Sequence, residues 1–186
     1  MSHNKDKILD ELLILQICEG DTKSLTLFVK RWQAKLVWFS FQVIHDKEEA
    51  QDIVQESWQG IIKGLQNLKE VRNYKSWMYR VIRNKSIDRI RKLQREQSAI
   101  EELKLETIQN EGTSNTEENA DIVLKVLQTL TTDLKEVLQL FYLERQSVED
   151  IVTILGIPSG TVKSRLFRAR EQMKASLLEV KHLIEF

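Results

Sequence analysis

Residues that interrupt a helix are scarce in this chain, which has one proline and six glycines among 186 residues. Proline and glycine disfavour a helix interior more than any other residues, so few natural breaks are available. Leucine, isoleucine, lysine, glutamate and glutamine are common, and no bounded segment alternates apolar and polar residues as a half-buried strand does. The sequence therefore predicts an all-α fold.

Charge is unevenly distributed, although Lys+Arg and Asp+Glu balance at 28 each. Nine basic residues and one acidic residue lie within 72–95, whereas eight acidic residues and one basic residue lie within 96–121. The acidic stretch includes NEGTSNTEEN, which has no large apolar side chain to offset the entropy lost on ordering. We expect two small helical domains, 1–95 and 122–186, joined by a flexible acidic linker at 96–121.

The C-terminal domain has the pattern of a helix-turn-helix. Ser147 can cap the segment SVEDIVTIL, and Asp150 stands at the reciprocal position of a capping box. Gly156 can take the left-handed conformation that ends a helix, while Pro158 and Ser159 break the chain and cap the next helix. In this motif the second helix enters the major groove, and its N-terminal residues meet base edges.

The segment GTVKSRLFRAR at 160–170 is the predicted recognition helix. Its apolar residues have a 4-3-4 spacing and should pack on the preceding helices, one of which spans 133–143 with an apolar face of Leu134, Val137, Leu138 and Phe141. The outward residues suit DNA, since cations and hydroxyls bond base edges or phosphates and a phenyl ring can touch a thymine methyl. These are Lys163, Ser164, Phe167 and Arg168, and Arg165 beside them can hold a phosphate or an acidic neighbour.

The N-terminal domain contains a strongly amphipathic segment at 46–65. Its apolar face consists of Val54, Trp58, Ile61 and Leu65, and its polar face of Asp52, Gln55, Glu56 and Gln59. That polar face is either a solvated helix surface or a docking surface for a basic or mixed partner. The residues by themselves favour neither interpretation.

Aromatic and basic residues are interleaved in the segment at 67–92. This mixture suits single-stranded nucleic acid, because bases stack on rings while cations follow the phosphates. We expect Trp77 in the core and a basic surface for DNA built from Arg72, Tyr74, Lys75, Arg80 and Arg83.

Four segments, in this order and spacing, resemble the extracytoplasmic-function group of bacterial sigma factors: GDTKSLTLFVKRW, EEAQDIVQESW, SWMYRVIRNKSIDRIR and SVEDIVTILGIPSGTVKSRLFRAR. The resemblance extends from about Leu12 to Leu177 and omits the linker and both ends. It implies a sigma factor that directs core RNA polymerase to promoters by binding the −10 and −35 elements, and so initiates transcription.

The resemblance also implies roles for particular residues. The second segment would bind the β′ clamp helices of polymerase through Asp52, Gln55 and Glu56. The following loop and helix would recognise the −10 element, with Asn84 supporting a pocket for a flipped base beside Arg72, Tyr74, Lys75, Arg80 and Arg83. The loop carries Leu68, Lys69 and Val71 where the family has a more polar stretch. The last helix would read the −35 element with Lys163, Ser164, Arg165, Phe167 and Arg168.

The implied partners are core polymerase, through its β′ clamp helices and β flap, promoter DNA, and an anti-sigma factor. No cofactor, metal site or enzymatic activity is expected, because the three histidines match no metal spacing and no nucleophile has a companion base. Cys18 is the one cysteine, which excludes an intramolecular disulfide, and we expect it to be buried as an apolar residue. Without a signal peptide or an apolar run of membrane-spanning length, the chain is expected in the cytoplasm, with no insertion in the membrane.

Three other functions are weighed against this interpretation. An enzyme with a DNA-binding tail, such as a recombinase, would nick DNA. A repressor or activator that needs no polymerase contact would bind DNA tightly and specifically by itself. A sigma-like decoy would bind polymerase without supporting transcription.

Overall fold

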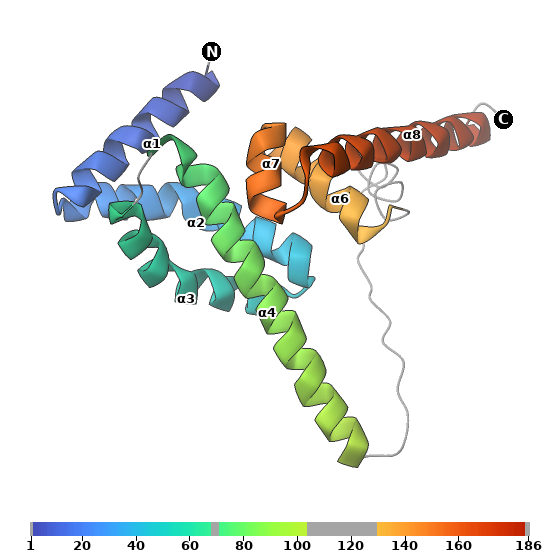
Figure 1. Cartoon of the computed structure of the whole chain (residues 1–186), viewed down its shortest axis with the longest axis horizontal. Helices are drawn as coiled ribbons and strands as arrows, with labels where there is room; N and C mark the ends of the chain where they lie inside the picture. The colour runs from blue at the N-terminus through green and yellow to red at the C-terminus, as the bar shows by residue number, and fades with distance from the viewer. Residues whose placement is uncertain (1, 68–70, 104–129, 185–186) are drawn as a thin grey trace. The chain divides into compact units, whose positions relative to one another are not determined.

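The computed structural model describes residues 2–67, 71–103 and 130–184, which form helices and turns and contain no β-strand. These residues belong to two compact units, an N-terminal unit ending at residue 103 and a C-terminal unit starting at residue 130 (Figure 1). The predicted all-α fold is therefore confirmed.

The N-terminal unit is a bundle built around one central helix. It comprises α1 (Ser2–Cys18), α2 (Thr22–Ile44), α3 (Lys47–Gln66), the short 3₁₀ helix η1 (Val71–Asn73) and α4 (Tyr74–Leu103). Helix α2 packs against α1, α3 and α4. Because α2 supplies contacts to all three, the relative placement of α3 and α4 depends on the core that they share with it.

Aromatic rings fill that shared core. Trp32 and Phe28 of α2 lie against Tyr74 of α4 in edge-on geometry, with centroid distances of 5.7 and 6.2 Å. Phe39 lies edge-on to Tyr79 at 4.8 Å. Such edge-to-face pairs add about 0.5–1.5 kcal/mol each beyond the area that they bury, so they set how α4 is seated on α2.

Aspartates mark where α2 and α3 begin. The Asp21 carboxylate accepts bonds from the backbone N–H groups of Lys23 and Ser24, both at 3.1 Å, and a bond from the Ser24 hydroxyl lowers the pKa of Asp21. Asp46 accepts from the N–H of Glu49 at 2.9 Å. These bonds satisfy N–H groups that have no partner within the helix, so the sequence specifies both starts locally.

Helix α4 continues beyond the predicted domain end at 95, through Leu103. The added residues are good helix formers, and Lys92 pairs with Glu96 one turn later at 3.8 Å. Residues 91–97 are exposed, so this part of α4 projects from the bundle (Figure 1). Residues 104–129, which include most of the predicted linker, lie outside the described residues, and the domain limits stay a prediction.

The C-terminal unit has the predicted helix-turn-helix. It comprises α6 (Thr132–Leu138), the π-helical turn η2 (Gln139–Leu143), α7 (Val148–Leu155) and α8 (Ser159–Ile184). The capping box is present, with Ser147 Oγ accepting from the Asp150 N–H at 3.0 Å and Asp150 accepting from the Ser147 N–H at 3.1 Å. Gly156 ends α7 at a φ of 68°. Ser159 is the first residue of α8 and not its cap, because the Pro158 carbonyl accepts from Val162.

The helix predicted over 133–143 is present at 132–143, but its second half is π-helical and not α-helical. The α-helix ends at Leu138, and the N–H of Glu144 bonds the carbonyl of Gln139, five residues back. This wider turn changes which side chains face inward, so that Leu140 is fully buried and Phe141 is only half-buried.

The prediction that Cys18 is buried is wrong. Cys18 is the last residue of α1 and is exposed. Its Sγ lies 3.9 Å from the carbonyl oxygen of Leu65, within reach of a weak S–H bond. The apolar residue that seals this end of α1 is Ile17, which is 3% exposed.

Removal of the Ser147 hydroxyl is expected to destabilise the C-terminal unit by about 1 kcal/mol, because Ser147→Ala deletes both bonds of the cap side chain. Amide hydrogen exchange over α7 measures the loss. Ser164→Ala is the matched control, since the Ser164 hydroxyl only returns to the Thr161 carbonyl within α8. Equal exchange rates in the two variants would contradict the expectation.

Candidate nucleic-acid interface

The polar side of α3 has the composition that the sequence predicted. Asp52, Gln55 and Glu56, here named the acidic face, are all exposed, while the opposite side of the helix buries Val54, Trp58, Ile61 and Leu65. Glu56 differs from the other two because it pairs with Arg89 of α4 at 3.0 Å. The face thus presents carboxylates and an amide suited to a basic or mixed surface, and its partner remains a prediction.

A groove beside the acidic face was missed by the sequence reasoning. It has a volume of about 850 Å³ and runs between α2 and α3, with Gln55 on one wall and Trp38 and Phe41 on the other. Trp38 and Phe41 are 38% and 37% exposed. The sequence contained one indication of this groove: α2 has more aromatic residues than can fit on a single buried face of the helix.

The basic residues predicted for −10 recognition do not share one surface. Arg80, Arg83 and Asn84 lie at i, i+3 and i+4 on one side of α4, with Arg80 and Asn84 exposed and Arg83 half-buried. Arg72 is exposed on η1. Lys75 is half-buried over the ring of Trp32, 5.8 Å from its centroid, and burial lowers the pKa of Lys75. We name the Arg80, Arg83 and Asn84 surface the reading face of α4.

The structure contradicts Tyr74 as a DNA contact. Tyr74 is 0% exposed, and its hydroxyl donates to Oδ2 of Asp10 at 2.9 Å. Burial, reinforced by the Asp10 charge, raises the pKa of Tyr74, so the hydroxyl keeps its proton. No base can stack on a ring that the core covers on all sides. Trp77, predicted in the core, is half-buried.

Helix α8 presents the predicted DNA-reading residues together. Lys163, Ser164, Phe167 and Arg168 are all exposed, whereas Val162, Leu166 and Ala169 on the other side are buried. Phe167 is 64% exposed and is the most exposed large apolar side chain among the described residues. An apolar ring flanked by cations and held in water suits a DNA groove, where the thymine methyl offers an apolar contact.

Arg165 is turned away from these four residues. Its guanidinium pairs with Asp133 of α6, and its side chain is 21% exposed. Of the two partners that the sequence left open, a phosphate or an acidic neighbour, the structure therefore shows the acidic one. Arg170 is also engaged internally, over the rings of Phe141 and Tyr142 at 5.6 and 5.5 Å. We accordingly remove Arg165 from the DNA-reading set.

The residues that the structure describes include no group of three or more His, Cys, Asp or Glu side chains that could hold a metal ion. Within the same ranges, none of the helices combines the length and the apolar character needed to cross a membrane.

Comparison with known proteins assigns both units. The family Sigma-70 region 2 matches residues 28–96, and Sigma-70, region 4 matches residues 120–173. The RNA polymerase sigma-H factor of Pseudomonas aeruginosa is 30% identical over 180 residues, which is 90% of this chain and 93% of that protein. The ECF RNA polymerase sigma-E factor of Haemophilus influenzae is 28% identical over 183 residues, 91% of this chain and 95% of that protein.

Solved structures show the same fold. The sigma factor RpoE from Bartonella quintana, in complex with the anti-sigma factor NepR, matches with a TM-score of 0.65 and 24% identity over 84% of this chain and 98% of that chain. CnrH, in complex with the cytosolic domain of CnrY, matches with a TM-score of 0.63 and 22% identity over 92% of this chain and 98% of that chain. The resemblance that the four sequence segments indicated is confirmed, and the chain belongs to the sigma-70 family of RNA polymerase sigma factors, in its extracytoplasmic-function group.

Proposed function

We propose that this chain directs core RNA polymerase to promoters by using the acidic face of α3 for polymerase, the reading face of α4 for the −10 element and the outward face of α8 for the −35 element. The observation that carries the proposal is the α8 surface, where exposed Phe167 lies between Lys163, Ser164 and Arg168. The chain performs no covalent chemistry of its own, and polymerase synthesises the RNA.

Recognition of the −35 element is a duplex-reading step. The apolar side of α8 is sealed against the C-terminal unit, so the helix is held rigidly while its other side meets the major groove. Lys163 and Arg168 supply cations for guanine edges or phosphates, and Phe167 supplies an apolar contact for thymine. Lysine at 163 provides a point charge without the planar fork of arginine, which lowers its discrimination between bases.

Recognition of the −10 element is a strand-opening step. Arg80, Arg83 and Asn84 on α4 supply cations and an amide for an unpaired strand, and Arg72 on η1 adds a cation before the start of that helix. Capture of an unstacked base offsets the few kcal/mol that unpairing costs. Each unit is expected to bind DNA weakly by itself. When polymerase holds both units, binding of one promoter element raises the effective concentration of the other element at the second unit, so the two together are selective.

Regulation follows from the same surfaces. The structurally similar RpoE was solved in complex with the anti-sigma factor NepR, and CnrH in complex with the cytosolic domain of CnrY. We extend this to the present chain: an anti-sigma factor would cover the polymerase-facing surface in the cytoplasm and so prevent docking. The β flap of polymerase is the proposed partner of the C-terminal unit.

Run-off transcription with purified core polymerase and a randomised promoter library tests the function. Enrichment of templates with defined −10 and −35 sequences is expected only when the chain and core are both present. Tight sequence-specific DNA binding by the chain alone would favour a repressor or activator. Polymerase binding without transcripts would favour a decoy, and nicked templates would favour an enzyme.

Arg168→Ala is expected to weaken binding to the −35 element by about 1–3 kcal/mol, or about 5- to 150-fold, because it removes a base- or phosphate-bonding cation from the exposed face of α8. Binding of the holoenzyme to a −35-dependent promoter measures this. Lys174→Ala is the charge-matched control, since Lys174 is exposed further along the same helix. Equal affinities for wild type and Arg168→Ala would remove Arg168 from the interface.

A further inference from the structure

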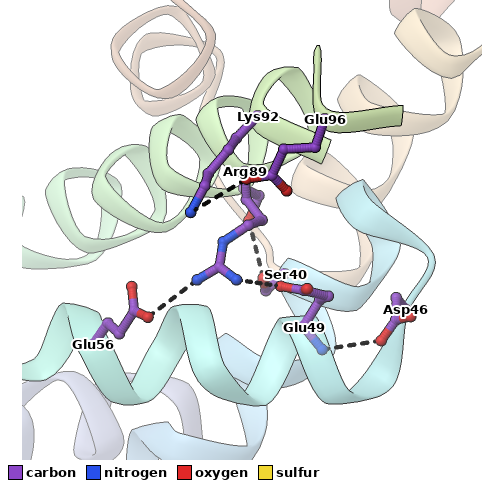
Figure 2. A network of polar contacts seen from close by, with 8 residues as sticks. Ser40, Asp46, Glu49, Glu56, Arg89, Lys92 and Glu96 are labelled. Carbon is purple, nitrogen blue, oxygen red and sulfur yellow. Dashed lines mark hydrogen bonds and ion pairs between the residues drawn. The ribbon is translucent and has the colours of Figure 1, made fainter. Parts of the chain in front are cut away.

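Arg89 connects the two helices that carry the proposed polymerase and −10 surfaces. From α4, its Nη1 lies 2.7 Å from Oε2 of Glu49 and its Nη2 lies 3.0 Å from Oε1 of Glu56, both on α3 (Figure 2). Only 22% of the Arg89 side chain is exposed, although residues 91–97 just beyond it are all exposed. Arg89 therefore makes its contact near the level at which α4 leaves the bundle.

The two carboxylates have different surroundings. Glu49 is 24% exposed, and its backbone N–H is held by Asp46 at the start of α3, so this end of the bridge is anchored (Figure 2). Glu56 is 59% exposed and belongs to the acidic face of α3. The Arg89 guanidinium thus links Glu49, which is held at the start of α3, to Glu56, which is exposed to a partner.

A second contact at the same level fixes α4 against α2. Ser86 lies three residues before Arg89 on α4, and its hydroxyl bonds the hydroxyl of Ser40 at 2.9 Å in the buried core. The reading face of α4 begins one to two turns earlier, at Arg80. Since α4 is fixed at this level to both α2 and α3, these bonds add to the aromatic core in setting the angle of the reading face relative to the acidic face.

Arginine suits this position for a geometric reason. Its planar guanidinium presents two separate NH₂ groups, which can reach two carboxylates that are two helical turns apart. Lysine carries the same charge on a single ammonium, which can pair closely with one carboxylate at a time.

We propose that Arg89 is a positioning residue that joins the acidic face of α3 to the reading face of α4, so that polymerase docked on α3 holds the −10 reader at a productive angle. The inference rests on the proposed function and adds a residue that neither reads DNA nor faces polymerase. A partner that binds Glu56 would therefore also affect the ion pair between Glu56 and Arg89, which helps to orient α4.

The test separates docking from promoter opening. Arg89→Lys and Arg89→Gln are compared with Arg91→Gln, whose side chain is 69% exposed on the same helix and pairs only loosely with Asp88 at 3.5 Å among the described residues. Core affinity is measured by fluorescence anisotropy of labelled chain, and open complexes are counted at saturating core. We expect both Arg89 variants to form about 2- to 30-fold fewer open complexes per bound chain, while Arg91→Gln matches wild type.

Two further measurements can contradict the inference, and the first does so even if Arg89→Gln folds poorly. Glu49→Gln, outside the acidic face, should reproduce the Arg89→Lys defect, and combining the two should add little. The slope of log affinity for the promoter against log salt concentration should be the same for wild type and Arg89→Gln. A slope smaller by about one for Arg89→Gln would show that Arg89 contacts a phosphate, and would overturn the proposal.

Different results would overturn the positioning role of Arg89 and the proposed function. Open complexes formed equally by Arg89→Lys, Arg89→Gln and Arg91→Gln, with an active wild type, would overturn only the positioning role. A wild-type chain that neither binds core nor supports transcription would overturn the proposed function, and this inference with it.

Discussion

Asp10→Ala is expected to destabilise the N-terminal unit by about 3 kcal/mol. Asp10 is 2% exposed and accepts bonds from Arg31 Nε at 2.8 Å and from the Tyr74 hydroxyl at 2.9 Å. Its removal leaves the hydroxyl of fully buried Tyr74 without an acceptor and breaks a partly buried ion pair. In this variant Asp6 still pairs with Arg31 at 3.2 Å, so the loss of stability should lie at the lower end of the range for broken buried ion pairs.

Urea unfolding followed by tryptophan fluorescence measures this loss in the full chain, because all four tryptophans lie in the N-terminal unit. Tyr74→Phe should cost about 1 kcal/mol, and the double variant less than the sum, since both changes delete the same bond. Asp6→Ala is the control at a half-exposed carboxylate on the same arginine, and it should cost under about 1 kcal/mol. Equal losses for Asp10→Ala and Asp6→Ala would show that the buried carboxylate has no special role.

Gly64→Val is expected to destabilise the same unit by about 3 kcal/mol, because a Cβ at this position in α3 would overlap Cη2 and Cζ2 of Trp77 on α4. The indole is a rigid ring system, so it cannot fold away from an added side chain as a flexible chain end would. Tryptophan-fluorescence unfolding again measures the change.

Gly60→Val is the matched control one turn earlier on α3, where an added Cβ meets no atom within 4 Å. Since valine is slightly better than glycine in a helix interior, this variant should change stability by less than about 0.5 kcal/mol. Trp77→Leu combined with Gly64→Val should recover part of the loss by making room. If both valine variants were equally stable, close contact between α3 and Trp77 would be excluded.

Local features of the sequence predicted most of what is short-range in this protein. The scarcity of proline and glycine indicated helices, Ser147 and Asp150 marked the start of α7, and Gly156 marked its end, because caps and left-handed turns depend on a few adjacent residues. The exposed residues of α8 were predicted correctly apart from Arg165. Within one helix, the 3.6-residue period is enough to distinguish Lys163 and Phe167 from the buried residues.

Long-range pairs were beyond the same reasoning. Asp10 and Tyr74 are 64 residues apart, so nothing in either neighbourhood indicated that Tyr74 would lie in the core, bonded to this carboxylate and out of reach of DNA. The same is true of Asp133 and Arg165, and of Arg89 with its two glutamates. Helical periodicity in the sequence thus determined which side of each helix meets water. The packing of α1, α3 and α4 on α2, and of α6 on α8, decided which charged side chains form ion pairs. An ion pair depends on the distance between two groups in space, and their separation in the sequence does not give that distance.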